Sequence, residues 1–307
     1  MPTQVVLDPR LPQEAAGKTV IVTGGANGIG AATITRYNDH GANVVIADLP
    51  GSRASAEALI KSLAHPEKAL FVPVDILNWV QMKDLFRAAK EQFGQIDIVV
   101  ANAAIMETSP VLNLDALDSE GDLLESREAF KVIDVNIKGT LNSKAPENPL
   151  QLNLGKKRIK FTYIYLTALR LAMHHMQYSG GSVVLMASTS GYFGGTGVAA
   201  YVTSKHGVIG LMRSSQIAAN KYGIRINAVA PFFTPTHITS SYADNWKDAG
   251  LEANTPEGVA AVIMQASLDD NRSGTCILVW SKDHPSSWLV VKTIANKCTT
   301  SRHVEVY

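Results

Sequence analysis

Cysteine is scarce in this chain of 307 residues, which contains only Cys276 and Cys298. Two cysteines make no disulfide framework, and no Cys/His spacing resembles a metal site, so we expect no bound metal. Apolar runs stay short of the ~20 residues that a membrane-spanning helix requires. The first residues, with Asp8 and Glu14, form no apolar leader. These absences predict a soluble protein without a membrane partner, located in a reducing compartment such as the cytoplasm.

An excess of one charge is also lacking, because 28 Lys and Arg residues nearly balance 27 Asp and Glu residues, for a net charge of +1. This balance gives no reason to expect nucleic acid as a partner. Hydrophobic residues make up 46% of the chain and charged residues 18%, as in an ordinary globular protein. Since no internal repeat or low-complexity linker divides the chain, we predict a single domain over residues 1–307.

Short Val- and Ile-rich runs alternate with longer amphipathic segments, which predicts an α/β fold with a parallel sheet of about seven strands and helices on both faces. The strands lack clean alternation, as expected when both faces of the sheet are buried. We expect strands near 18–23, 43–48, 69–74, 96–101, 181–187, 224–230 and 275–280. We expect helices near 28–40, 52–64, 78–93, 126–140, 164–178, 199–222 and 256–268.

A glycine-rich turn follows the first predicted strand and opens the first predicted helix, in the sequence Thr23-Gly24-Gly25-Ala26-Asn27-Gly28-Ile29-Gly30. Gly24 permits a tight turn, Gly28 lets the backbone approach a pyrophosphate, and Gly30 lets the helix pack closely. The helix N-terminus then offers unpaired N–H groups to phosphates. The alternative is an ordinary glycine-rich turn. The context of strand, turn and helix favours dinucleotide binding.

Asp48 ends the second predicted strand, where a carboxylate can accept a hydrogen bond from a ribose 2′-hydroxyl. The same carboxylate would repel a 2′-phosphate, and Arg53 is the only cation nearby. The sequence therefore favours NAD over NADP. A cap for a turn or helix is the alternative role of Asp48.

Tyr201 and Lys205 stand at positions i and i+4 of a predicted helix, and Ser188 ends the strand before it. The spacing places the phenol and the ammonium on one helix face. A neighbouring cation favours phenolate and would lower the pKa of Tyr201 toward the range that a general acid/base needs. A solvated helix face is the alternative interpretation of the pair alone.

Taken together, these residues resemble the short-chain dehydrogenase/reductase family, from about Lys18 to Leu278. The resemblance implies a doubly wound, Rossmann-type fold and a single NAD(P)-binding domain. It also implies that Asp75 meets the adenine ring, and that Asn102 and Ala103, within Ala101-Asn102-Ala103-Ala104, border the cofactor. In the family motif Asn-Asn-Ala-Gly the first Asn and the last Gly stand where this chain has alanine.

The family's catalytic Asn, Ser, Tyr and Lys match Asn136, Ser188, Tyr201 and Lys205. The resemblance implies that Asn136 holds a helix kink and a water linked to Lys205. It implies that Ser188 binds the substrate oxygen, that Tyr201 exchanges its proton, and that Lys205 binds the nicotinamide ribose. A buried Asn at a helix bend is the alternative for Asn136.

A proline-bounded segment after the sixth predicted strand, Pro231-Phe232-Phe233-Thr234-Pro235-Thr236, resembles the family's segment beside the nicotinamide. Pro231 would border the cofactor, and Thr234 or Thr236 would meet the carboxamide. Aromatic residues follow in the region that covers the substrate in this family, namely Phe232, Phe233, Tyr242 and Trp246. They suit an apolar or ring-bearing alcohol or ketone, or else pack a loop onto the body.

Two regions depart from the family. Asn136 and Ser188 lie roughly twice as far apart as usual, which places an atypical insertion at about 142–168. It is either a surface insertion or translated non-coding sequence, and its patternless composition favours the second. The insertion interrupts the helix that begins near residue 126. In the family this helix packs between subunits, so the insertion bears on the expected homodimer or homotetramer and on the placement of Asn136. The tail at about 281–307 shows neither an apolar helical pattern nor a further turn-and-strand unit.

The sequence thus predicts an oxidoreductase that moves hydride between NAD(H) and a secondary alcohol or ketone. The stretch from Tyr201 to Arg213 is most similar to 15-hydroxyprostaglandin-dehydrogenase-like members and to fungal polyketide alcohol dehydrogenases. The alternatives are a non-catalytic nucleotide-binding or scaffold protein, whose assembly helix is disrupted, and an NADPH-dependent carbonyl reductase.

Overall fold

The computed structural model describes residues 3–4, 6–140, 151–154, 157–160, 168–194, 197–250, 252–280 and 288–292. The predicted insertion at 142–168 and the predicted tail at 281–307 fall largely outside the described residues. Inside the first lies a two-stranded antiparallel hairpin, formed by β6 (Gln151–Leu154) and β7 (Lys157–Lys160).

Seven parallel strands form the body of the sheet, in the order β10-β9-β8-β5-β2-β3-β4. The chain enters at β2, runs outward to β4, returns to place β5 on the other side of β2, and then runs outward to β10. This is the doubly wound, Rossmann-type arrangement that the sequence predicts, with each strand where it is expected. The strands are β2 (Thr19–Thr23), β3 (Asn43–Asp48), β4 (Ala69–Pro73), β5 (Ile98–Ala101), β8 (Gly181–Met186), β9 (Ile224–Pro231) and β10 (Thr275–Val279).

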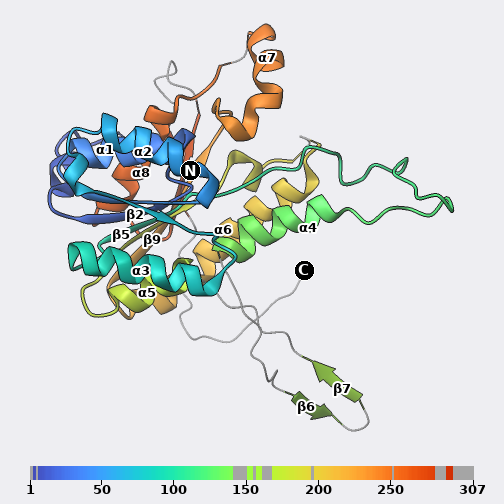
Figure 1. The fold of residues 1–307 in the computed structure, drawn as a ribbon, viewed down its shortest axis with the longest axis horizontal. Helices are drawn as coiled ribbons and strands as arrows, with labels where there is room; N and C mark the ends of the chain where they lie inside the picture. The colour runs from blue at the N-terminus through green and yellow to red at the C-terminus, as the bar shows by residue number, and fades with distance from the viewer. Residues whose placement is uncertain are drawn as a thin grey trace.

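Helices cover both faces of the sheet, with α1, α2 and α8 on one side and α3, α5 and α6 on the other (Figure 1). No helix of the described ranges is long and apolar enough to cross a membrane. The helices are α1 (Gly28–Asp39), α2 (Arg53–Ser62), α3 (Trp79–Phe93), α4 (Arg127–Ile133), α5 (Ala168–Met176), α6 (Ala199–Asn220), α7 (Ser240–Asp248) and α8 (Pro256–Leu268).

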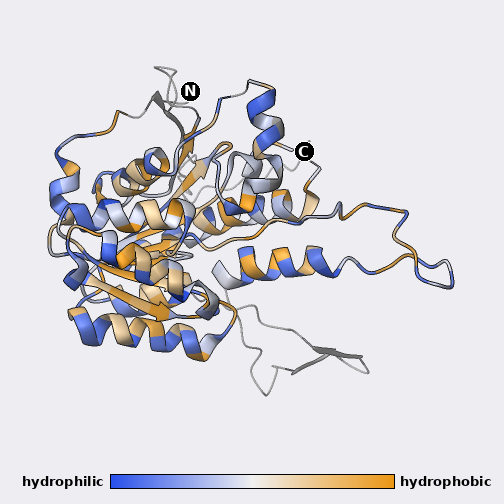
Figure 2. Ribbon diagram, turned by 45° about the horizontal axis from the view of Figure 1, so that its top comes forward, coloured by the Kyte–Doolittle hydropathy of each residue, from blue (hydrophilic) through white to orange (hydrophobic). Residues whose placement is uncertain are grey.

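The strands are apolar on both faces because each face contributes to a separate core. Ile21 of β2 belongs to the cluster under α3, α5 and α6, whereas its neighbours Val20 and Val22 belong to the cluster under α1, α2 and α8. All three side chains are fully buried. Figure 2 shows the resulting hydrophobic strands at the centre and mixed colouring on the helices. Burial on both sides explains the unbroken Val/Ile runs.

The predicted helix at 126–140 is α-helical only as far as Ile133, and Asp134–Gly139 form a π-helical turn. Single π turns inside helices occur often at functional sites. The predicted helix at 164–178 is described from Ala168 to Met176 as α5, and its first residues lie outside the described ranges.

The expectation that no strand follows β10 was wrong. β11 (Trp288–Lys292) pairs antiparallel with β10, and the two-residue strand β1 (Thr3–Gln4) pairs antiparallel with β11. The run Trp-Leu-Val-Val-Lys has the β-branched and aromatic character of a strand, although the surrounding tail hides this signal. Helix α7 was also missed, because its sequence is polar and short.

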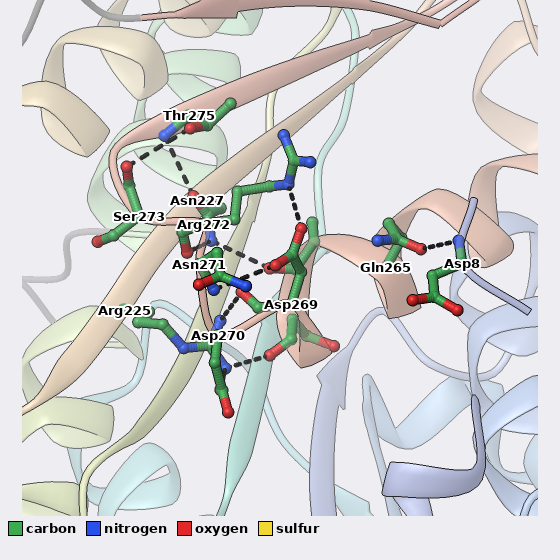
Figure 3. Close-up of polar contacts among 12 residues, drawn as sticks. Asp8, Arg225, Asn227, Gln265, Asp269, Asp270, Asn271, Arg272, Ser273 and Thr275 are labelled. Carbon is green, nitrogen blue, oxygen red and sulfur yellow. Dashed lines mark hydrogen bonds and ion pairs between the residues drawn. The ribbon is translucent and has the colours of Figure 1, made fainter. Parts of the chain in front are cut away.

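A polar network fastens the amino-terminal edge of the sheet (Figure 3). Arg225, near the start of β9, donates to the carbonyl oxygens of Ser267 at 2.6 Å and Asp269 at 3.1 Å, and pairs with Asp270 at 3.1 Å. Asn227 donates to the carbonyl oxygen of Ala266 at the end of α8. These bonds satisfy backbone groups in the connection between α8 and β10. The candidate functional residues gather at the opposite, carboxyl edge.

Candidate active site at the carboxyl edge of the sheet

A cavity of about 530 Å³ lies at the carboxyl ends of the central strands. Crevices at this edge, near the point where the strand order reverses, are where doubly wound folds bind ligands. Many of the residues predicted from the sequence line the cavity, namely Ile29, Asn102, Ser188, Tyr201, Lys205, Pro231, Thr234 and Thr236. Residues from the whole length of the chain, from Ile29 to Trp280, therefore meet in one place.

The glycine turn adopts the conformation that the sequence predicts. Gly24 has φ +64° and Gly28 has φ +54°, values that residues with a side chain rarely adopt. A Cβ on Gly30 would overlap the carbonyl oxygen of Gly24, so the first turn of α1 packs directly on the turn before it. Asn27 has extended backbone as the N-cap residue, and its carbonyl accepts from the Ala31 N–H at 3.2 Å. The helix N-terminus thus faces the cavity edge.

Asn102 ties this turn to the end of β5. Its Nδ2 donates to the carbonyl oxygens of Thr23 at 3.0 Å and Gly24 at 3.1 Å. The N–H groups of Asn102 and Ala103 donate to the hydroxyl of Thr23 at 3.1 and 3.2 Å. Asn102 therefore anchors the glycine turn to the end of β5 through its side chain and its main chain.

Asp48 lies at the end of β3, under the glycine turn. Its carboxylate accepts from the Ala26 N–H at 3.0 Å, from the Leu49 N–H at 2.8 Å and from the Ser52 hydroxyl at 3.0 Å. The nearby cation, Arg53, pairs with Glu57 at 3.5 Å and lies over the ring of Phe71 at 5.2 Å. The carboxylate is therefore fixed next to the turn, while the guanidinium is engaged along α2.

Asp75 follows β4 and holds the loop that leads into α3. Its carboxylate accepts from the Leu77 N–H at 2.9 Å, and its own N–H donates to Gln81 at 2.7 Å. Asp75 does not line the cavity, so its predicted place beside an adenine ring stays a prediction.

Ser188 and Tyr201 face each other in the cavity wall. Ser188 follows β8 and is 8% exposed. Its hydroxyl oxygen accepts from the Ser190 N–H at 3.1 Å. Burial raises the pKa of Tyr201 above its ordinary value of 10.0, a hydrogen bond with Ser188 lowers it, and the charge of Glu107 raises it. The net direction is opposite to the lowering that the sequence predicts, because burial of the phenol outweighs the favourable contacts.

Lys205 lies one turn after Tyr201 on α6, with its Nζ 5.4 Å from the centre of the Tyr201 ring. The side chain is only 3% exposed, and its Nζ donates to the carbonyl oxygen of Met186 at 2.8 Å. Burial lowers the pKa of Lys205 from 10.5 to about 8. The predicted one-face arrangement of the phenol and the ammonium is confirmed.

Asn136 is placed in the π turn, where it bridges two elements. Its Oδ1 accepts from the Ile105 N–H at 2.8 Å, and its Nδ2 donates to the Ile105 carbonyl at 2.7 Å and to the Ser204 hydroxyl at 3.0 Å. The side chain is 1% exposed. Asn136 thus connects the loop after β5 to α6, and it does not line the cavity. The helix changes there from α to π, and the kink and the water linked to Lys205 stay predictions.

The segment after β9 closes over the glycine turn. The Thr236 side chain packs so closely on Gly28 that a Cβ there would lie 3.1 Å from Thr236 Cγ2. Thr234 is 4% exposed and donates to the carbonyl oxygen of Phe232 at 3.0 Å. The carbonyl of Pro231 accepts from Ser188 at 3.5 Å. The segment therefore links the glycine turn to Ser188.

Aromatic rings form one wall of the cavity. Phe232 stacks on Trp280 with ring centres 4.2 Å apart, and Phe233 stacks on Trp246 at 4.3 Å. The edge of Trp246 also meets Phe232 at 5.4 Å. Tyr242 lines the same cavity. The aromatic residues predicted to cover the substrate do lie at the cavity, and they also pack against one another; their contact with a substrate stays a prediction.

Sequence reasoning missed two residues of the site. Trp280, the residue after β10, lines the cavity and was not among the predicted site residues. Glu107 was not singled out, although its buried carboxylate accepts from the N–H groups of Ala200 at 2.8 Å and Tyr201 at 2.9 Å. Its partners stand far along the chain, and no local pattern signals the contact.

Comparison with known proteins agrees with this geometry. The sequence profile of the family described as short chain dehydrogenase matches residues 18–145 and 161–247. The unmatched stretch between them lies inside the predicted insertion. The chain has TM-score 0.67 and 22% identity to the structure of a 3-ketoacyl-(acyl-carrier-protein) reductase from Brucella melitensis complexed with NADH, covering 86% of this chain and 97% of that one. That likeness concerns the fold.

Among curated proteins, the short-chain dehydrogenase/reductase prx4 of Penicillium roqueforti is 32% identical over 253 residues, or 82% of this chain. The chain spans only 65% of the length of that relative. Short-chain dehydrogenase reductase 5 of Arabidopsis thaliana is 33% identical over 232 residues, or 74% of each chain. With the profile match, the fold and the shared sequence in agreement, the chain belongs to the short-chain dehydrogenase/reductase family of oxidoreductases.

Proposed function

We propose that the protein transfers hydride between NAD(H) and a secondary alcohol or ketone with an apolar or ring-bearing body. The observation that carries the proposal is that Ser188, Tyr201 and Lys205 share one cavity with the segment that closes over the glycine turn. A proton-handling group and a nucleotide-binding turn are the two halves that such a reaction needs.

The residues present fit a dinucleotide. The backbone turn at Gly24 and Gly28, the N-terminus of α1 and the carboxylate of Asp48 offer a phosphate cradle and a ribose acceptor. Asp48 is fixed beside the glycine turn, whereas Arg53 lies along α2 with Glu57 and Phe71, which supports NAD over NADP.

The chemistry assigned to the chain is proton transfer and orientation. When bound, the nicotinamide supplies or accepts the hydride at the carbon of the substrate. In reduction, Tyr201 gives its proton to the substrate oxygen, so that C=O becomes CH–OH, and oxidation reverses this transfer. Ser188 binds the same oxygen. Lys205 orients the ribose and stabilises the Tyr201 phenolate that forms when the proton leaves. A raised pKa keeps Tyr201 protonated, the form that reduction requires.

The lining of the cavity supports an uncharged, apolar substrate. Among the described lining residues Lys205 is the only one that carries a charge at neutral pH. Flat aromatic surfaces from Phe232, Trp246 and Trp280 offer stacking contacts to a ring. A carboxylate or phosphate on the substrate would find no cation there other than the catalytic one.

Replacing Tyr201 by Phe tests the proposal. We expect turnover to fall by about a thousandfold, since a positioned general acid contributes about that much. NADH binding should change little, because the phenol oxygen is not needed to hold the dinucleotide. A panel of secondary alcohols and ring-bearing ketones, read by absorbance of the reduced nicotinamide, measures turnover. Titration with NADH and NADPH measures binding.

Tyr178→Phe is the matched control, because Tyr178 is 94% exposed and remote from the cavity lining. Unchanged turnover in Tyr201→Phe would contradict the mechanism. If the unaltered protein binds NADH but turns over no member of the panel, it acts as a nucleotide-binding scaffold instead. Tighter binding of NADPH than of NADH would contradict the cofactor assignment.

A further inference from the structure

Glu107 is a buried carboxylate that the catalytic assignment above does not use. It stands in the loop after β5, is 2% exposed, and belongs to none of the elements that carry Ser188, Tyr201 or Lys205. A buried carboxylate is costly unless it is paired or hydrogen-bonded. Its retention in the core therefore needs a compensating set of donors.

Those donors are the first N–H groups of the catalytic helix. Glu107 Oε1 accepts from the Ala200 N–H at 2.8 Å, and Oε2 accepts from the Tyr201 N–H at 2.9 Å. Val198, the N-cap residue of α6, makes no side-chain cap. The opening N–H groups of a helix lack partners within it, and the helix dipole favours a negative charge there. Glu107 thus supplies from elsewhere in the chain the cap that α6 lacks.

We propose that Glu107 is a positioning residue for the reaction, which clamps the first turn of α6 and thereby fixes the place and the proton transfer of Tyr201. The inference rests on the proposed function, because it assumes that Tyr201 handles the proton. One carboxylate oxygen is bonded to the main-chain N–H of Tyr201 itself, so loss of the clamp displaces the phenol relative to Ser188.

The charge of Glu107 acts on the same phenol. Its negative charge raises the pKa of Tyr201, after the larger effect of burial. The other charged group close to Tyr201 is Lys205 on the same helix, and Tyr242 is a further titratable group of the described cavity lining. Ser188 from the β8 side and Asn136 from the π turn are uncharged. Among these groups, Glu107 is therefore the acidic one, and its charge favours the protonated phenol.

The test compares Glu107→Gln with the unaltered protein over a range of pH, using a ketone that the panel has shown to be reduced. The amide keeps the shape of the side chain but removes its charge and one acceptor. We expect the pH at which kcat/KM falls by half to move down by about one unit, as expected when a nearby unit charge is removed from a partly buried site. NADH affinity should stay within about twofold, since the two bonds of Glu107 go to the N–H groups of α6 and neither goes to the glycine turn.

Tyrosinate absorbance gives a second readout that needs no substrate. The titration of Tyr201 is isolated by subtracting the curve of Tyr201→Phe in the same background, and its midpoint should move down by the same amount in Glu107→Gln. Glu128→Gln is the matched control. Glu128 accepts from Thr108 at 2.8 Å and from Ser109 at 3.1 Å, so this change removes a carboxylate that holds the same loop but does not touch α6. Its pH profile should equal that of the unaltered protein.

Glu107→Asp separates the effect of the charge from the effect of the side-chain length. The shorter side chain keeps the charge but cannot span both N–H groups, so we expect kcat to fall severalfold with little change in the pH midpoint. This variant also decides the question if Glu107→Gln does not fold. An unmoved midpoint in folded Glu107→Gln, or full kcat in Glu107→Asp, overturns the inference. Loss of turnover in Tyr201→Phe alongside either result would leave the proposed function intact.

Discussion

Lys205 carries a buried positive charge, which is costly for the folded state. One carbonyl oxygen, from Met186, accepts from the ammonium, and burial lowers its pKa from 10.5 to about 8. The folded state thus loses this proton before the unfolded state does as the pH rises. Between these two values the unfolded chain binds more protons, so stability rises with pH. The cost of burying the charge is fully present below about pH 8.

Lys205→Met should remove this pH dependence. We expect the free energy of unfolding of the unaltered protein, relative to the variant, to rise by about 2 kcal/mol from about pH 7.5 to about pH 9.5. The methionine fills the same space without a charge, although it leaves the Met186 carbonyl without its donor. Urea unfolding at several pH values measures the difference. A constant difference across this range would show that the ammonium is better solvated than the structure indicates.

Single residues were predictable from the sequence where their signal is local. Tyr201 and Lys205 share a helix turn, and the glycines stand within one loop, so the spacing alone placed them correctly. Asp48 was predicted from its position at the end of a strand that the sequence shows clearly. Glu107 could not be found in this way, because its partners are backbone N–H groups far along the chain. The pKa of Tyr201 was also beyond reach, because it depends on burial that only the packed fold provides.

At the scale of elements, two helical glycines differ, because packing requires Gly30 of α1 but not Gly210 of α6. In α1, Gly30 is needed because a side chain would overlap the carbonyl oxygen of Gly24. In α6, a Cβ on Gly210 would meet nothing within 4 Å, and the residue is exposed. Gly210 therefore weakens its helix without a packing reason that the described residues show.

Alanine at the two positions should have opposite effects. Gly30→Ala should lower the free energy of unfolding by about 2 kcal/mol, as overpacking against backbone does, and abolish NADH binding. Gly210→Ala should raise it by up to about 1 kcal/mol through the better helix propensity of alanine. Urea unfolding and NADH titration measure both effects. Equal behaviour of the two variants would contradict the close approach of α1 to its turn.

Elements with a strong apolar composition were predicted well, and elements without it were not. The parallel strands other than the edge strand β4 are largely buried on both faces, so their Val/Ile content marks them clearly. Helix α7 is polar and short, and β11 is one five-residue apolar run in a stretch of sequence without further pattern, so neither was predicted. The change from α4 to a π turn around Asn136 depends on bonds to Ile105 and Ser204, which no periodicity encodes.

For the whole molecule, the sheet has one edge formed by antiparallel strands. β11 covers β10 with a register from Thr275 opposite Lys292 to Val279 opposite Trp288, and β1 covers β11. The β10 side chains are all buried. Without β11 their strand would present unpaired N–H and C=O groups to other chains. The single domain, the homodimer or homotetramer and the cytoplasmic location stay predictions.

Truncation after Trp280 tests this edge. We expect Tm to fall by about 5 °C or more and self-association to increase, because β10 becomes an open strand. Truncation after Lys292 is the control, as it removes residues 293–307 and keeps β11. Thermal unfolding and size-exclusion chromatography measure the two outcomes. Identical behaviour of both truncated forms would show that β11 does not protect the sheet.

The stacked rings at the cavity also allow ligand binding to be followed by the intrinsic fluorescence of the protein. The chain has four tryptophans, and Trp246 and Trp280 both line the cavity. Each stacks on a phenylalanine of the segment that follows β9. A molecule that enters the cavity must change the surroundings of these indoles, and with them the emission of the protein. Ligand screening can therefore begin from intrinsic fluorescence, before any substrate has been identified.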